Sequence, residues 1–93
     1  MKYNSFFNLS MKKFSFEGTT IELGQFSDCE LQEASFKGCN LKETSFQDCQ
    51  LLQANFAESY GFLIDLTQNK VRGARFSSEH GPVLLSSLGI HLE

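Results

Sequence analysis

The chain has 93 residues and a formal net charge of −3, which fits one small domain. Its acidic residues lie mostly in the middle and its basic residues near the ends, so direct binding to nucleic acid, which requires Lys and Arg on the phosphates, is not expected. No apolar run reaches the ~20 residues of a membrane span, and no signal peptide is evident, so we expect a cytoplasmic protein with reduced cysteines and no membrane partner.

Large apolar residues recur every five positions from near the N-terminus. They lie at Phe6, Met11, Phe16, Ile21, Phe26, Leu31, Phe36, Leu41, Phe46, Leu51 and Phe56. From residue 19 onward a small residue precedes each of them by two positions, for example Cys29, Ala34 and Cys39. Neither the period of about 3.6 residues of a helix nor the period of about 2 of a strand explains this spacing. The pattern indicates a chain that turns a corner after every five residues and sends one large and one small side chain inward.

Four such units would close a coil of about twenty residues, with successive coils stacked about 4.8 Å apart. Aromatic and aliphatic residues alternate along the repeat, so the phenylalanines fall into two stacks on opposite faces. The predicted core stack consists of Phe16, Phe36, Phe56 and Phe76 on one face, and of Phe26 and Phe46 on the other. We therefore predict an all-β solenoid with a filled core.

Residues 34–38 (Ala-Ser-Phe-Lys-Gly) and 39–43 (Cys-Asn-Leu-Lys-Glu) resemble the repeat of the pentapeptide-repeat family. Its pattern is a small residue, a polar residue, Leu or Phe, and two variable residues. The resemblance implies a right-handed quadrilateral β-helix, here of about four coils with a short C-terminal helix. Leu9 and Phe14 depart from the pattern, because they occupy the small position. Either they cap the first coil, or the chain is a shortened form of a longer protein.

The repeat is interrupted over residues 57–69, where Gly61 stands at a position for a large apolar residue. We predict a loop in the last coil here, with the register returning at Leu66, Val71 and Phe76. Residues 1–76 are thus expected to form the β-helix, and residues 77–93 a helix and a short strand. Ser78 is the expected N-cap of this helix, and Gly89 its C-terminal stop.

The C-terminal tail is similar to that of the quinolone-resistance (Qnr-like) group of pentapeptide-repeat proteins. In that group the terminal helix and strand form a twofold dimer interface. The resemblance places these apolar residues near a dimer seam: Leu84, Leu85, Leu88, Ile90 and Leu92. The alternative is that the helix covers the open end of its own solenoid without dimerisation.

No catalytic, metal-binding or cofactor-binding motif is found, and we expect none of these functions. Cys29, Cys39 and Cys49 lie ten residues apart in the small inward position, unlike the closely spaced ligands of zinc sites, so we expect them to be buried and free. His80 and His91 are expected to be surface or cap residues. Catalytic sites are usually concave, and a filled solenoid has no interior pocket, so an enzyme is not expected.

Four acidic residues suggest a function. Asp28, Glu30 and Glu33 are expected around one corner, with Asp48 one coil above Asp28. This acidic strip is either a solvated face or a surface that engages a basic partner. One predicted function is a non-enzymatic protein-protein interaction module with an unknown protein partner, homodimeric through the tail. The alternative, implied by the Qnr-like resemblance, is a DNA mimic that binds a type II topoisomerase (gyrase) and protects or inhibits it.

Overall fold

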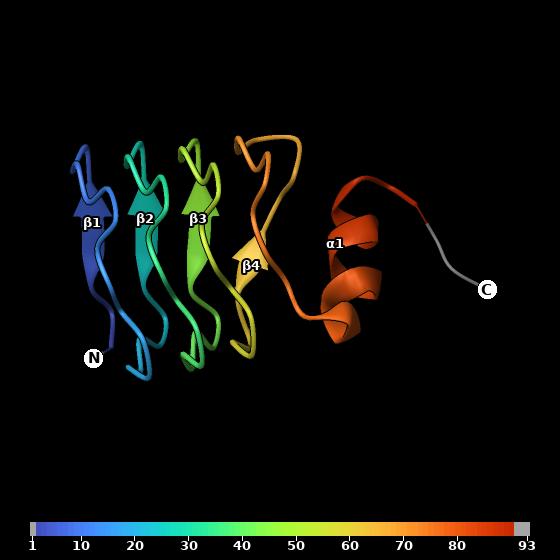
Figure 1. Ribbon diagram of the computed structural model, residues 1–93, viewed down its shortest axis with the longest axis horizontal. Helices are drawn as coiled ribbons and strands as arrows, with labels where there is room; N and C mark the ends of the chain where they lie inside the picture. The colour runs from blue at the N-terminus through green and yellow to red at the C-terminus, as the bar shows by residue number, and fades with distance from the viewer. Residues whose placement is uncertain (1, 91–93) are drawn as a thin grey trace.

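The computed structural model describes residues 2–90. Within them, short parallel strands form one sheet in the order β1-β2-β3-β4, and they lie side by side along the long axis of the molecule (Figure 1). The strands are β1 Ser5–Phe7, β2 Gln25–Ser27, β3 Ser45–Gln47 and β4 Leu63–Ile64. A 3₁₀ turn, η1 Ser78–His80, and the helix α1 Gly81–Ser87 follow at the end of the molecule next to β4 (Figure 1).

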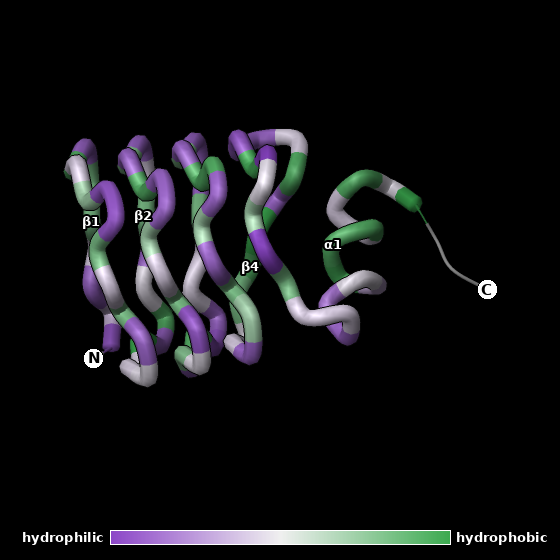
Figure 2. The backbone as a smooth tube through the Cα atoms, viewed as in Figure 1, coloured by the Kyte–Doolittle hydropathy of each residue, from purple (hydrophilic) through white to green (hydrophobic). Residues whose placement is uncertain are grey.

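The chain winds as a β-solenoid. Ser5 pairs with Gln25, and further bridges repeat this same sequence offset in ladders that start at Ser10, Ser15 and Thr20. Figure 2 shows hydrophobic and hydrophilic segments alternating within each coil. From Phe16 to Phe56 the large residue of each unit is buried. The predicted solenoid is therefore confirmed, and together with the C-terminal helix it extends to 37 Å along the longest axis of the molecule.

Residues with a positive φ form the corners between the ladders. They recur every five positions and include Tyr3, Asn8, Lys13, Gly18, Leu23, Asp28, Glu33, Gly38, Glu43, Asp48, Gln53 and Glu58. The left-handed region costs an L-residue about 1–2 kcal/mol, and less for Asn and Asp. Residues such as Leu23 and Glu43 keep this backbone conformation because hydrogen bonds between successive coils hold the corner in place.

Replacing Glu43, a corner residue with a φ of 56°, by glycine is expected to stabilise the protein. The relief of backbone strain exceeds the entropy that glycine loses on folding, so we expect a gain of about 0.5–1 kcal/mol. The matched control is Gly38→Ala, where φ is 70° and an added Cβ meets no atom within 4 Å. Urea denaturation should show this control less stable by about 1 kcal/mol. A loss of stability in Glu43→Gly would contradict the interpretation.

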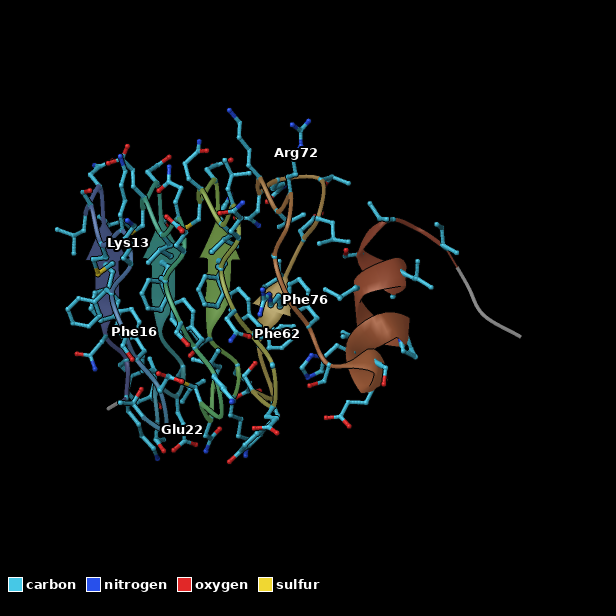
Figure 3. The ribbon with its side chains drawn as sticks, in the orientation of Figure 1. Lys13, Phe16, Glu22, Phe62, Arg72 and Phe76 are labelled. Carbon is cyan, nitrogen blue, oxygen red and sulfur yellow. The ribbon has the colours of Figure 1, made fainter. Side chains whose placement is uncertain are left out.

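Two columns of stacked phenylalanine rings fill the centre of the solenoid. The first column consists of Phe16, Phe36, Phe56 and Phe76, with neighbouring ring centroids 4.7, 4.9 and 5.2 Å apart. Phe26 and Phe46 stack at 4.8 Å in the second column, which Phe6 extends at 4.5 Å. The two columns meet edge to face, an arrangement that stabilises each pair by ~0.5–1.5 kcal/mol beyond burial alone. Figure 3 shows Phe16 and Phe76 towards opposite ends of this core.

Polar groups in the small inward positions link neighbouring coils. The Oγ1 of Thr44 donates to the carbonyl oxygen of Ile21 at 2.6 Å, and the Sγ of Cys49 donates to that of Phe26 at 3.3 Å. All three cysteines are buried and free. Burial raises the pKa of the Cys49 thiol to about 11, so this group remains a neutral hydrogen-bond donor near neutral pH.

Leu9 and Phe14, the bulky residues in the small positions of the first coil, remain largely exposed. The ring of Phe14 packs at 4.7 Å against that of Phe16, which is buried although it lies near the end of the core. The ring of Phe14 therefore helps to shield Phe16 from solvent.

The interruption of the repeat is smaller than predicted. The prediction of a loop over residues 57–69 is wrong for much of this segment, because Tyr60 still pairs with Asn40 and β4 pairs with β3. Ser45 pairs with Leu63, so fewer residues separate these two partners than separate paired residues in the earlier coils. The earlier separation returns at Lys70, which pairs with Gln50. The chain thus omits two residues before β4 and recovers them in the turn that follows it. The register does not return at Leu66.

Gly61 makes this shortened passage possible. Its φ is +82°, and a Cβ atom built on it would lie 2.6 Å from the Cα of Lys42 in the preceding coil. The chain therefore approaches the backbone of Lys42 more closely than any residue with a side chain could. Phe62 and Ile64 follow and are buried, so both belong to the core although neither was predicted there.

The tail differs from the prediction at its start and agrees with it at its end. The predicted N-cap, Ser78, is wrong, because Ser77 has the extended conformation that precedes η1 and Ser78 lies within the turn. Gly89 ends α1 as predicted, with a φ of 78°. The N–H groups of Gly89 and Ile90 donate to Ser86 and Leu85, which is the Schellman pattern. The short strand predicted to follow the helix lies mostly in residues 91–93, outside the described residues. Neither η1 nor α1 is long and apolar enough to cross a membrane.

Candidate interaction surface

The structure divides the predicted acidic strip. Asp28 and Asp48 occupy equivalent corners of neighbouring coils, with φ values of 54° and 53°. The N–H of Asp28 donates to the carbonyl oxygen of Gln47 at 3.1 Å, which places the two corners directly above one another. Both carboxylates are exposed, so they form a continuous acidic column along one edge of the solenoid.

The other two predicted residues lie away from this column. Glu33 is the next corner residue along the chain, and its Oε2 lies 4.0 Å from the Nζ of Lys13. Glu30 lies between the corners formed by Asp28 and Glu33, and its backbone pairs with Ser10 and Gln50. The charge of Glu33 is thus partly balanced, whereas no salt bridge to Asp28 or Asp48 is found within the described residues.

Asp65 adjoins the acidic column and was not predicted. It follows Ile64, which pairs with Phe46, so it lies beside the corner that holds Asp48. Hydrogen bonds from the side chain and the backbone N–H of Thr67 lower the pKa of Asp65, which therefore remains ionised at neutral pH. Asp28, Asp48 and Asp65 are called the acidic corner below.

The acidic corner differs in charge from the rest of the solenoid. Its segments 7–8, 27–28, 47–48 and 65–68 contain three aspartates and no Lys or Arg. The remaining corners carry both signs: Lys2, Glu22, Lys42 and Glu43; Lys12, Lys13, Glu33 and Arg72; Glu17, Lys37 and Glu58. Figure 3 shows Glu22 and Arg72 on opposite edges of the molecule. The acidic corner is therefore an unbalanced anionic edge on a surface of otherwise mixed charge.

An open groove of about 380 Å³ adjoins the acidic corner at the end of the sheet. Leu63 and Ile64 of β4 line one side of it, Val83 of α1 lines the other, and Asp65 belongs to both the groove and the acidic corner. Leu63 and Val83 are 54% and 50% exposed. Figure 2 colours much of α1 as hydrophobic. Because Leu63 and Val83 are exposed, this end of the surface is apolar, while the corner beside it is charged.

The predicted dimer residues divide between the core and the surface. Leu84 packs against the core, and Leu85 is half-buried. Leu88 and Ile90 are exposed, whereas Leu92 lies outside the described residues. The exposed apolar side chains of the tail are thus Val83, Leu88 and Ile90.

His80 fastens the tail to the end of the solenoid. It is 7% exposed, and its Nε2 lies 2.7 Å from the carbonyl oxygen of Ser59. Its ring packs edge-on against Phe62 and Phe76, with centroid distances of 4.8 and 6.2 Å. The tail therefore covers the end of the core, and His80 has the role of a buried cap residue. The described residues contain no group of three or more His, Cys, Asp or Glu side chains that could hold a metal ion.

A family model for pentapeptide repeats, in eight copies, matches residues 25–59. A search of curated proteins finds no match. Among solved structures, a trypsin-treated form of QnrB1, a plasmid-mediated fluoroquinolone resistance protein, has a TM-score of 0.51 and 17% identity, over 100% of this chain and 45% of that chain. A second trypsin-treated form gives a TM-score of 0.47 at 17% identity, over 96% of this chain and 45% of that chain.

A pentapeptide repeat protein from the cyanobacterium Cyanothece 51142 is more distant, with a TM-score of 0.37 and 11% identity over 84% of this chain and 60% of that chain. The chain thus spans less than half the length of the QnrB1 chains that it matches. At this identity the similarity to QnrB1 concerns the fold alone, and it agrees with the solenoid. The repeat and its corners agree with the family model, so residues 25–59 are a run of pentapeptide repeats.

Proposed function

We propose that this protein is a non-enzymatic protein-protein interaction module that binds a basic surface of its partner through the acidic corner. The observation that carries the proposal is the column of Asp28, Asp48 and Asp65 without a Lys or Arg at the same corner. A solenoid holds such charges at a fixed spacing of ~4.8 Å per coil. Complementary charge of this kind steers association and selects among partners.

The chemistry of the interior supports a role without catalysis. Phenylalanine and aliphatic side chains fill the centre of the coils, and the three cysteines are buried there. A buried, protonated thiol such as that of Cys49 is a poor nucleophile. The Nε2 of His80 contacts a backbone carbonyl at the end of the core, and the residue is buried.

We further infer a right-handed quadrilateral β-helix of about four coils over residues 1–76, with residues 77–93 as the cap and dimerisation tail. The constant pairing offset between the earlier coils and the corner at every fifth position support the coil geometry. Three free cysteines fit a reducing compartment, and we propose a cytoplasmic location.

The exposed Leu88 and Ile90 would lie at a homodimer seam. Light scattering of Leu88→Asp tests this dimer, and an unchanged mass would count against it.

A second candidate function is mimicry of DNA toward a type II topoisomerase. The solenoid similarity to QnrB1 and the acidic corner favour it. About four coils at ~4.8 Å each rise about 19 Å, which corresponds to about six base pairs at ~3.4 Å each, so each molecule would make a small contact. A gyrase supercoiling assay with and without a quinolone separates the two candidates. Neither inhibition nor protection at micromolar protein would eliminate the mimic.

Removing the charges of Asp28 and Asp48 is expected to abolish partner binding without changing the fold. The test compares wild type, Asp28→Asn/Asp48→Asn and the control Glu43→Gln/Glu58→Gln as baits in a host lysate. The control removes the same charge from other corners. We expect partners that bind wild type and the control, do not bind the aspartate variant, and dissociate as salt is raised. Retention of the same proteins by all three baits would refute the role of the acidic corner.

A further inference from the structure

We propose that the groove between β4 and α1 receives one apolar side chain of an extended, basic segment of the partner protein, whose Lys or Arg residues lie along the acidic corner. This inference rests on the proposed function, because it names the class of segment that the acidic corner binds. It adds a requirement that charge alone does not impose, namely an apolar anchor at a defined place.

Leu63 is the first reason to assign a ligand to the groove. In the earlier coils its position on the outer face of the sheet is occupied by the polar residues Ser5, Gln25 and Ser45, through the pairing of Ser45 with Leu63. Leu63 is 54% exposed, so its side chain contributes little to the core. Val83, 50% exposed on α1, lines the same groove from the other side. Two exposed apolar side chains from separate elements thus border one hollow.

The groove has the size and the firm walls that an anchor site needs. A volume of about 380 Å³ lies at the lower end of the range for ligand pockets, ~300–1,000 Å³, and suffices for one large side chain. The helix wall is held in place because the Oγ of Ser87 accepts a hydrogen bond from the N–H of Leu66 at 3.2 Å. Leu84, on the same helix, packs into the core. The groove is therefore formed before a partner binds.

Charge identifies the occupant. Asp65 lines the groove and continues into the column of Asp48 and Asp28, so an apolar side chain in the groove places its chain neighbours beside carboxylates. An extended segment advances about 3.3 Å per residue, and two coils of the column therefore lie within a few residues of the anchor. Nucleic acid and anionic membranes would be repelled by this edge. The same edge of a second copy would be repelled as well.

The test uses two synthetic peptides as probes, Lys-Ser-Lys-Phe-Lys-Ser-Lys and the same sequence with Ser in place of Phe. Fluorescence anisotropy at low salt measures their affinities for wild type, Leu63→Gln and Asp48→Asn. We expect wild type to bind the Phe peptide at least about tenfold more tightly, the effect of burying part of one aromatic side chain. Leu63→Gln should remove this preference and leave the Ser peptide unchanged, whereas Asp48→Asn should weaken both peptides.

Each other outcome has a defined meaning. Equal affinities of the two peptides for wild type, or an undiminished Phe preference in Leu63→Gln, would overturn the anchor groove. The proposed function would remain if Asp48→Asn still weakened both peptides, and it would fail if that variant had no effect. Light scattering of Leu63→Gln examines a second copy as the occupant, and conversion of a dimer to a monomer would overturn the assignment. Unchanged circular dichroism of both variants establishes that they are folded.

Discussion

Replacing Phe36 by alanine is expected to lower the free energy of unfolding by about 3–5 kcal/mol. Its ring is fully buried and lies between those of Phe16 and Phe56, at centroid distances of 4.7 and 4.9 Å. It also meets Phe26 and Phe46 edge to face. A narrow core bounded by paired backbone cannot collapse around the missing ring, so the variant retains most of the cavity.

Urea denaturation followed by circular dichroism measures this loss. Phe14→Ala is the matched control, because Phe14 is exposed and its ring contacts that of Phe16 at the end of the core. Exposed rings contribute much less than buried ones, and we expect the control to lose about 1 kcal/mol or less. Similar losses in the two variants would show that the rings of the repeat do not form a stacked interior.

The variant Gly61→Ala is expected to lose about 2–4 kcal/mol, since the change combines backbone strain with overpacking. A Cβ atom at this position would lie 2.6 Å from the Cα and 3.0 Å from the N of Lys42. Both are backbone atoms of the preceding coil, so a change of rotamer cannot relieve the contact. The two coils must separate where Gly61 accepts a hydrogen bond from the N–H of Glu43 at 2.9 Å.

Gly38→Ala distinguishes the two contributions, because Gly38 also has a positive φ but has open space around an added Cβ. We expect it to lose about 1 kcal/mol from strain alone. Amide hydrogen exchange should in addition be faster at Glu43 and Leu63 in Gly61→Ala. If the two alanine variants are equally stable, the close passage over Lys42 is incorrect.

The repeat made the solenoid and its aromatic core predictable. Every unit from Phe16 to Phe56 places one large side chain inward, and the stacking of equal coils then follows from the period alone. The period of five also places Asp28 and Glu33 at two consecutive corners, because they stand at the same position of successive units. The expectation that both lie at one corner ignored this spacing, and the separation of Glu33 from the acidic column is the result.

The segment around Gly61 could not be predicted in the same way. Its shortened step depends on how closely the chain passes Lys42, a contact between residues far apart in the sequence. Once the step changes, the period of five assigns Phe62 and Ile64 to the wrong positions, and it does not place Asp65 in the acidic column. His80 was predicted only as a surface or cap residue, because its burial depends on the rings of Phe62 and Phe76.

The core, the acidic corner and the groove all require that equivalent residues of successive coils, such as Phe26 and Phe46, lie in contact. Nuclear Overhauser effects between the ring protons of Phe36 and Phe56 measure this contact most directly. The structure, with these ring centroids 4.9 Å apart, predicts strong cross peaks between the two rings. Cross peaks of the helical kind along residues 34–56, with no contact between these two rings, would contradict the solenoid and every surface derived from it.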